Sequence, residues 1–375
     1  MHRALLPTAL CALAVSFFAA TSAGQGGRLT GPESSPALRQ AISAAAQKYK
    51  IPGIAAAWVV GGALRGIEVS GVRDVSSNAP VTPNTVFEAG ALGEPIYAYS
   101  VLLLGADGNF NPGALLPSYL PPPYVRYLDP TSASPVTEPL YEPLFNQVSA
   151  IRVMNHTSGL PDWARNKHMF WANPPGKKWS YSSEGYLYLQ KAVENFTGEP
   201  FTDFVARNVL GPARMAHSSF IWRDVDSGDR AVGYDRNGAP VAVQHYARPA
   251  ATATLTTSIR DYEQFVRLLL SSAPAQRAHE SAVSLMLGPT VAVDDPVPFS
   301  WGLGVALEKK GDDVFFFHRD KSAGFQSFVI ANRKTGNALV ILTNSGNGLD
   351  AVSDIVAATL GGDHPVLKSN FVHLQ

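Results

Sequence analysis

Nearly every residue in the segment 96–104 is apolar. A helix with this pattern has no polar face, so we expect it to run through the protein core. Pro95 is tolerated in its first turn, because the amide that proline lacks would have no helical partner there. The segment 105–109, Gly-Ala-Asp-Gly-Asn, then ends the helix. Residues 87–104 therefore predict a loop that leads into a buried central helix.

Strand patterns occur at both ends of the chain. Residues 54–60 and 63–72 are rich in small and β-branched residues, and Gly61 and Gly62 between them predict a hairpin. In the C-terminal third, short segments alternate or are β-branched, with glycine and Asp or Asn turns between them. Their close spacing implies antiparallel pairing. These segments are 302–308, 314–318, 326–332 and 338–343.

Helical patterns fill most of the remaining chain. Residues 36–49 and 349–360 predict a helix near each end, whereas the proline-rich segment 109–147 predicts an irregular surface segment. We therefore expect an α/β (α+β) fold, in which helices flank one antiparallel sheet built from both termini. A mostly helical insert would fill about residues 95–290. Its other predicted helices are 186–196, 200–210 and 258–270.

The first 23 residues have the pattern of a signal peptide. Arg3 supplies a positive charge, residues 4–20 form an almost unbroken apolar run, and residues 21–23 are small enough for cleavage. A membrane anchor is the alternative, but the run is short and the small residues follow it at once. We expect residues 1–23 to be removed and residues 24–375 to form one domain. The mature protein would be secreted or periplasmic, with no stable membrane anchor.

Composition excludes several function classes. Lys plus Arg and Asp plus Glu both number 30, so no surplus of positive charge points to nucleic acid or an anionic membrane. The one cysteine, Cys11, lies in the predicted signal peptide, so the mature chain has no disulfide and no thiol nucleophile. No H-E-x-x-H or other metal spacing occurs. We expect no metal, no other cofactor, no nucleic acid, and a small molecule as the partner.

Four short motifs carry the chemical information. The first lies in residues 87–94, and the second is His-Thr-Ser-Gly-Leu-Pro at 156–161. The third is Tyr-Ser-Ser-Glu-Gly at 181–185, and the fourth is His-Arg-Asp-Lys-Ser-Ala-Gly-Phe at 318–325. The residues of these motifs and their order along the chain resemble those of the penicillin-binding protein and serine β-lactamase superfamily, in its class C-like, DD-peptidase and esterase branch. The resemblance covers about residues 35–360 and implies a β-lactamase/transpeptidase-like fold.

The resemblance implies a role for each matched position. In the family, the first motif is F-x-x-x-S-x-x-K, with Ser as the nucleophile and Lys as its base. The Tyr of the third motif helps to shuttle the proton, and the strand of the fourth aligns the substrate and supplies an oxyanion-hole amide. By position, Ala91 replaces the nucleophile, Glu94 replaces the lysine, and Tyr181 matches the tyrosine. The candidate catalytic residues are thus Glu94, Tyr181 and His318, and the candidate ligand-contacting residues are Ala91, Ser183, Glu184, Asp320 and Gly324.

Three positions depart from the family pattern. Ala91 has no nucleophile, Glu94 reverses the charge of the base, and Asp320 places a side chain where a glycine would let substrate approach. No displaced S-x-x-K occurs elsewhere in the chain. Ser158 in the second motif is interpreted as a turn hydroxyl that bonds local backbone, rather than as a nucleophile.

These departures leave three hypotheses about function. The first is a pseudo-hydrolase that binds a small acyl or peptide-like ligand. The second is an active enzyme in which Glu94, Tyr181 and His318 do acid–base chemistry. The third is a residual esterase or peptidase that uses another serine, such as Ser182 or Ser183. The second requires Glu94 to be buried within hydrogen-bond reach of Tyr181 or His318, and the third requires a serine in the cleft beside a base.

Overall fold

The computed structural model describes residues 35–373, except residues 109, 129, 132–133, 140–142, 165–167, 247 and 274. The predicted signal peptide therefore lies outside the described residues. In the part of the chain that is described, none of the helices combines the length and the hydropathy needed to cross a bilayer.

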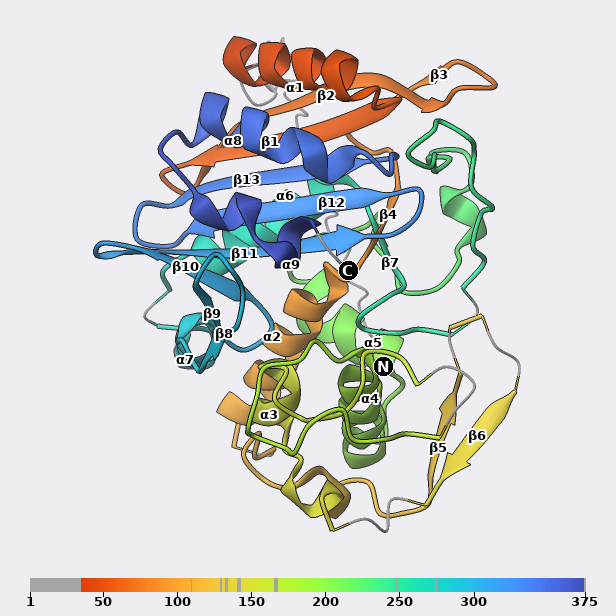
Figure 1. The fold of residues 1–375 in the computed structure, drawn as a ribbon, viewed down its shortest axis with the longest axis vertical. Helices are drawn as coiled ribbons and strands as arrows, with labels where there is room; N and C mark the ends of the chain where they lie inside the picture. Colours follow the sequence, from red (N-terminus) through yellow and green to blue (C-terminus); the bar gives the residue numbers. More distant parts are fainter. Residues whose placement is uncertain are drawn as a thin grey trace, which may run out of the picture. The chain divides into compact units, whose positions relative to one another are not determined.

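One large sheet contains strands from both ends of the chain (Figure 1). In spatial order its strands are β3 (Ala79–Pro80), β2 (Ala63–Asp74), β1 (Gly53–Val60), β13 (Asn337–Thr343), β12 (Gln326–Asn332), β11 (Asp313–Lys321), β10 (Ala306–Lys310), β9 (Phe299–Trp301) and β8 (Val291–Val293). Strand β1 pairs with β13, with Ala57 opposite Val340. All neighbouring pairs are antiparallel. The predicted fold class is thus confirmed.

Helices cover both faces of this sheet. On one face, α1 (Pro36–Tyr49) packs against α8 (Val352–Thr359). On the other face, α6 (Ile259–Leu270) contacts β1 and β13. Because successive strand residues point to opposite faces, Phe317 of β11 joins the core under α1, whereas Phe316 joins the core on the α6 side. The same alternation decides which residues of β11 face the candidate site.

The central helix α2 (Gly93–Ala106) is buried over its first ten residues, as its apolar pattern predicts. The short strand β4 (Phe87–Gly90) leads into it and pairs with β7 (Leu255–Thr257). Gly90 has a φ of +31°, and a Cβ there would lie 2.4 Å from Asp320 Oδ1. The approach to α2 therefore requires a glycine, for both its conformation and the space beside it.

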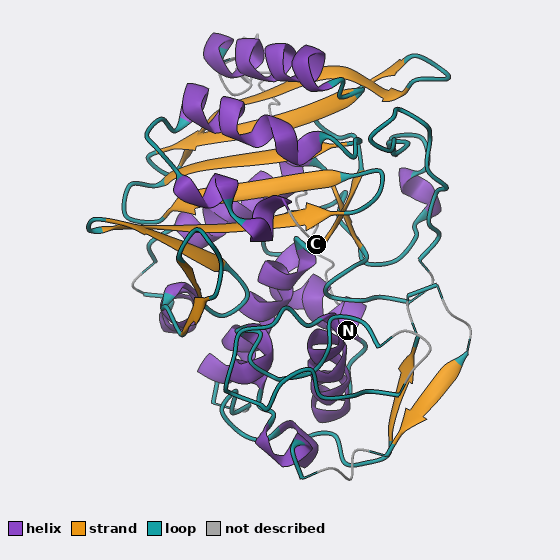
Figure 2. Cartoon of the chain, in the orientation of Figure 1, coloured by secondary structure: helices purple, strands orange, loops and turns teal. Residues whose placement is uncertain are grey.

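The helices of the insert contribute to the same hydrophobic core as α2, and most of them lie below the large sheet in Figure 2. The segment 109–147 contains a hairpin, so the prediction that it is irregular is wrong in this part. Arg126 explains the hairpin, because it is buried and its Nε donates to Glu138 Oε1 at 2.8 Å across the two strands. The further elements of the insert are β5 (Tyr124–Tyr127), β6 (Pro135–Glu138), α3 (Ala150–Met154), α4 (Ser183–Thr197), α5 (Phe201–Val205) and α7 (Arg277–Leu287). Outside the insert, the short helix α9 (Asn370–His373) packs into the core under α1.

Element boundaries match the sequence-based expectations unevenly. The helix predicted over 36–49 and the strand predicted over 326–332 have the observed bounds. The helix predicted over 200–210 is α5, which is followed by a π-helical turn at Ala206–Leu210. Helix α7 was not predicted, although its buried side chains pack into the same core as α2.

Candidate functional site

The side chain of Glu94 lies in the first turn of α2 and is fully buried. Its Oε1 accepts hydrogen bonds from Tyr181 Oη at 2.7 Å and from Thr252 Oγ1 at 2.6 Å. Its Oε2 lies 3.3 Å from His156 Nε2 and 3.4 Å from His318 Nε2. Neither histidine contact has the alignment of a hydrogen bond. Four side chains thus enclose one carboxylate, and we call these five residues the Glu94 cluster.

Separate parts of the fold deliver the members of the Glu94 cluster. His156 follows α3 in a turn with a φ of 55°, and Tyr181 precedes the N-cap residue of α4. His318 lies in β11, and Thr252 lies in the turn before β7. The cluster therefore joins the sheet to the helical insert at the start of α2.

Hydrogen-bond partners locate the protons on the two histidines. His156 Nδ1 accepts the Ser182 backbone N–H at 3.2 Å, so the ring proton of His156 is on Nε2 and faces Glu94. His318 Nδ1 lies 3.1 Å from the Arg319 carbonyl oxygen, which can only accept. His318 therefore carries a proton on Nδ1, and its Nε2 lies 3.4 Å from Glu94 Oε2.

The pKa values of Glu94 and Tyr181 show which forms these two groups take. Burial alone would raise the pKa of Glu94, but its interactions with His156 and His318 outweigh burial and lower the pKa to about 2. Burial and the negative charge of Glu94 raise the pKa of Tyr181 well above its ordinary range. At neutral pH Glu94 is therefore ionised and Tyr181 is a neutral donor. Neither is suited to take a proton from a substrate.

Asp320 holds the backbone amide at the start of α2. Its Oδ1 accepts the Ala91 N–H at 2.9 Å, and the residue is only 6% exposed. Its other oxygen, Oδ2, is buried, and none of the described residues donates a hydrogen bond to it. Burial raises the pKa of Asp320, although the Ala91 N–H opposes that shift.

A cleft of about 310 Å³ opens beside Ala91 and Asp320. On its wall, Ser183 Oγ donates to Asp162 Oδ1 at 2.6 Å and lies 3.2 Å from Thr252 Oγ1. Burial raises the pKa of Asp162, although the hydrogen bond from Ser183 lowers it. The cleft is lined by Ala91, Asp162, Trp163, Tyr181, Ser183, Tyr246, Thr252, Ala253, Arg319, Asp320, Lys321 and Ser322.

The three serines considered from the sequence have different places. Ser183 lines the cleft. Ser182 is the N-cap of α4, where its Oγ accepts the Gly185 N–H at 2.9 Å. Ser158 Oγ accepts the Leu160 N–H at 3.3 Å, which confirms its interpretation as a turn hydroxyl. Of these three, Ser183 is therefore the one whose hydroxyl is placed to meet a ligand.

Two predicted ligand-contacting residues do not lie in the cleft. Glu184 is fully buried, and its Oε1 accepts hydrogen bonds from Arg126 Nη1 at 3.1 Å and from the Ala164 N–H at 2.9 Å. Gly324 packs against another part of the chain, where a Cβ would lie 2.3 Å from Val241 Cγ2. Although both residues match a motif, Glu184 therefore serves in an ion pair and Gly324 allows close packing of the chain. The structure does bring Ala91, Ser183 and Asp320 to the cleft, and it brings Glu94, Tyr181 and His318 together beneath it.

Sequence reasoning missed three residues of this region. His156 lies in the second motif, but only its left-handed backbone conformation turns the ring toward Glu94. Thr252 lies in a run of small residues that matches no motif, and Asp162 directly follows the second motif. A polar residue beside a motif is the only sequence signal that could have indicated Asp162.

A carboxylate between two histidines has the composition of a metal site. Among the described residues, however, no group of three His, Cys, Asp or Glu side chains is placed to hold a metal ion. Glu94 Oε1 already accepts two hydroxyl groups, and the Nε2 atoms of His156 and His318 lie 3.3 and 3.4 Å from Oε2. The cluster is therefore best described as a buried carboxylate that is held by two hydroxyl groups and flanked by two imidazole rings.

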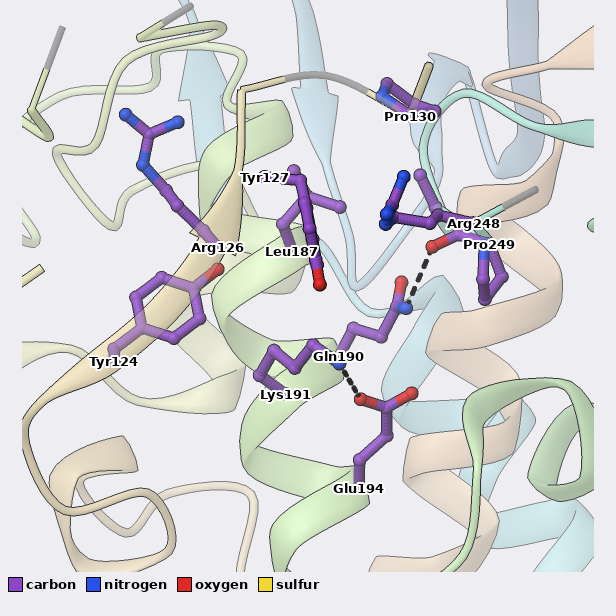
Figure 3. A pocket seen from close by; sticks show the side chains of 11 residues that line it. Tyr124, Arg126, Tyr127, Pro130, Leu187, Gln190, Lys191, Glu194, Arg248 and Pro249 are labelled. Carbon is purple, nitrogen blue, oxygen red and sulfur yellow. Dashed lines mark hydrogen bonds and ion pairs between the residues drawn. The ribbon is translucent and has the colours of Figure 1, made fainter. Parts of the chain in front are cut away.

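A second cavity, of about 260 Å³, lies beside α4 (Figure 3). It shares no lining residue with the cleft at Ala91. On its wall, Gln190 Nε2 donates to the Pro249 carbonyl at 3.0 Å, and Lys191 Nζ pairs with Glu194 Oε2 at 2.6 Å. These polar groups bind one another rather than converge on the cavity, so we base the candidate site on the cleft.

Comparisons with known sequences identify relatives over most of the chain. The family model described as Beta-lactamase matches residues 38–362. Protein flp of Staphylococcus aureus (strain MW2) is 22% identical over 314 residues, which cover 80% of this chain and 60% of that protein. The chain therefore spans about 60% of the length of the curated relatives that it matches first.

Solved structures share the fold at low sequence identity. The octameric penicillin-binding protein homologue from Pyrococcus abyssi has a TM-score of 0.72 and 18% identity, covering 90% of this chain and 79% of that chain. A class C beta lactamase from Rhodobacter sphaeroides has a TM-score of 0.70 and 17% identity, covering 87% of this chain and 100% of that chain. These likenesses support the mixed α/β fold with its antiparallel sheet from both termini.

Proposed function

The chain belongs to the Beta-lactamase family, and from that membership we propose that it is a pseudo-hydrolase, a protein with a serine-hydrolase fold that does not hydrolyse its ligand. It binds a small acyl or peptide-like molecule in the cleft beside Ala91. It acts outside the cytoplasm, as a secreted or periplasmic protein, because its first 23 residues have the pattern of a signal peptide.

One observation carries this proposal: the Asp320 carboxylate holds the Ala91 amide at 2.9 Å. In serine hydrolases, the nucleophile's own backbone N–H commonly belongs to the oxyanion hole. Here a carboxylate oxygen already accepts that N–H, and it would repel the negative charge that develops on a substrate carbonyl. Losing one oxyanion-hole donor costs about 10²- to 10³-fold in rate.

Two further residues support the absence of hydrolysis. Ala91 has no nucleophilic atom, and loss of a nucleophile typically costs on the order of 10⁴- to 10⁶-fold in rate. Glu94 occupies the position of the family's lysine, but its carboxylate is ionised and enclosed by four side chains. Glu94 does lie within reach of Tyr181 and His318, as the acid–base hypothesis required. Its lowered pKa and the raised pKa of Tyr181 speak against that hypothesis.

Stepwise restoration of the family residues tests the proposal. We would measure turnover of a chromogenic cephalosporin and a short-chain nitrophenyl ester by the native protein, by Ala91→Ser/Glu94→Lys, and by the same variant with Asp320→Gly. The native protein should match the buffer rate, and the triple variant should exceed the double variant because the Ala91 N–H is released. Ala63→Ser, at an exposed position in the β1–β2 hairpin, is the control. Native turnover above the buffer rate would refute the proposal.

A residual hydrolase that uses Ser183 is the second candidate function. Its support is the 2.6 Å hydrogen bond from Ser183 Oγ to Asp162 Oδ1 on the wall of the cleft. A carboxylate without an intervening histidine is a weak base for a serine hydroxyl, so any activity should be slow. If the native protein does turn over an ester, Ser183→Ala should abolish that activity, whereas Ser182→Ala should not.

A further inference from the structure

The cavity beside α4 differs from the cleft in the kind of side chain that lines it. Charged groups line the cleft, whereas rings and aliphatic side chains supply much of the cavity wall. The lining comes from β5 on one side, from α4 on another and from the segment 248–250 (Figure 3). Its apolar members are Tyr124, Tyr127, Pro130, Leu187, Pro249 and Ala250.

One face of α4 forms a side of the cavity. Leu187, Gln190, Lys191 and Glu194 lie three or four residues apart, so they share that face of the helix. Leu187 is only half-buried, whereas the next residue, Tyr188, is fully buried. The cavity thus leaves an apolar side chain of α4 partly exposed to solvent, and an apolar ligand would cover it.

Polar side chains around the cavity are already bound to the protein. Gln190 uses both ends of its amide, because Nε2 donates to the Pro249 carbonyl at 3.0 Å and Oε1 accepts the Ala251 N–H at 3.1 Å. Arg126 is buried and pairs with two buried glutamates. These contacts hold the walls in place before a ligand arrives, and the ligand does not have to supply their partners. A charged ligand would lose its hydration here.

Flat groups stack on the β5 side of the cavity. The guanidinium of Arg248 lies over the ring of Tyr127, 3.9 Å from its centroid, and both residues line the cavity. The ring of Tyr124 packs against that of Tyr188, with centroids 5.3 Å apart. A guanidinium and a tyrosine ring both attract the π face or edge of another ring. An aromatic ligand therefore gains contacts on this side that a saturated ring of the same size does not.

We propose that this cavity is a second binding site, which takes a flat, uncharged aromatic molecule about the size of two fused rings. Its volume is about 260 Å³, and an apolar cavity of about 150 Å³ is large enough to bind benzene. The ligand stacks against Tyr127 and packs on Leu187. This site goes beyond the proposed function and does not rest on it, because the cavity and the cleft share no lining residue.

The test compares two probes of the same skeleton, 2-naphthol and its saturated analogue decahydro-2-naphthol. Both are uncharged at neutral pH, but only the first is flat and has a π face. Calorimetric titration of the purified protein should show that 2-naphthol binds at one site. The saturated analogue should bind more weakly by at least about threefold, because it cannot stack on Tyr127 or Arg248.

Two variants locate the binding site. Leu187→Trp fills the cavity from α4 and should abolish binding, whereas Leu285→Trp, at an exposed position on α7, is the matched control and should leave binding unchanged. Tyr127→Leu keeps an apolar side chain but removes the ring. It should weaken 2-naphthol by at least about threefold and barely change the saturated analogue. This variant decides the matter if Leu187→Trp does not unfold cooperatively.

Three results would overturn this inference. They are no binding of 2-naphthol by the native protein, equal binding of the two probes, and full affinity for 2-naphthol in either folded variant. The last result would mean that 2-naphthol binds elsewhere, for example in the cleft. None of these results concerns hydrolysis, so the proposed function is tested separately.

Discussion

Two glutamates, Glu94 and Glu184, each lie in the first turn of a helix and are each fully buried. Their partners differ in kind. Glu184 pairs with Arg126, which also pairs with Glu138 at 2.8 Å. Glu94 instead meets two histidines and two hydroxyl groups. A guanidinium stays charged at all ordinary pH values, whereas an imidazole gains or loses its charge near neutrality.

The two environments move the glutamate pKa values in opposite directions. Burial raises the pKa of Glu184, although the charge of Arg126 opposes it. At Glu94, the interactions with His156 and His318 outweigh burial and lower the pKa to about 2. Burial alone therefore does not decide the protonation of a carboxylate in this protein, because the number and placement of its polar neighbours can reverse the effect of burial.

Removal of the cation at Glu184 should have the largest effect on stability. Arg126→Met would leave Glu138 and Glu184 buried without their shared cation, and should lower the free energy of unfolding by about 3–5 kcal/mol. Urea unfolding at neutral pH measures this change. Arg207→Met, which removes an exposed pair with Glu199, is the control and should barely change stability. Equal losses of stability in both variants would mean that breaking the buried ion pair costs no more than breaking the exposed one.

The pH dependence of Glu94 should come next in size. Its folded pKa of about 2 lies below its ordinary 4.5, so its stabilising contribution is complete above about pH 4.5 and is lost as the pH falls toward 2. This shift corresponds to roughly 3 kcal/mol. The unfolding free energies of the native protein and of Glu94→Gln should therefore converge as the pH is lowered from about 6 to about 3. A constant difference would contradict the assigned pKa.

Loss of one donor to Glu94 should have a smaller effect. Thr252→Val keeps the shape of the side chain but removes its 2.6 Å hydrogen bond to Oε1, and should cost about 1.5–3 kcal/mol of stability, the range for bonds to charged groups. The measurement is urea unfolding, with Thr137→Val at an exposed site of β6 as the control. An unchanged stability would show that Tyr181 alone satisfies Oε1.

The smallest expected effect is at Glu184, where the contribution to the free energy of unfolding should change with pH in the opposite direction from that of Glu94. Because its folded pKa is raised, the penalty for its ionised form exists above that pKa and is relieved as the pH falls through it. The stability of the native protein relative to Glu184→Gln should therefore rise on acidification, whereas that relative to Glu94→Gln falls. If the stability differences for Glu184→Gln and Glu94→Gln changed with pH in the same direction, the two glutamates would not differ in the way proposed.

The main elements of the fold could be predicted because local pattern and tertiary packing agree there. The apolar run that forms α2 leaves it no solvent face, and alternating residues suffice to define β12 in the centre of the sheet. The β5–β6 hairpin could not be predicted, because proline-rich sequence hides strands that depend on Arg126 and Glu138 meeting across them. Long-range charge pairs of this kind have no periodic signal in the sequence.

The candidate site was predictable only where a motif marks it. Motif order placed Glu94, Tyr181 and His318 near one another, but the same reasoning assigned Glu184 to the ligand, although its side chain pairs with Arg126. Thr252 reaches the cluster through the tertiary fold, from 158 residues away along the chain. Nor could any motif indicate that the Asp320 side chain would bond the backbone amide of Ala91.

The most direct test of the central claim is whether the protein can form an acyl-enzyme. The native protein would be incubated with benzylpenicillin and with an activated nitrophenyl ester, and its intact mass would then be measured. We predict no mass increase with either reagent, because Ala91 offers no nucleophile and Asp320 occupies its amide. A stoichiometric acyl adduct that maps to the cleft, for example to Ser183, would contradict the proposal that the protein is a pseudo-hydrolase.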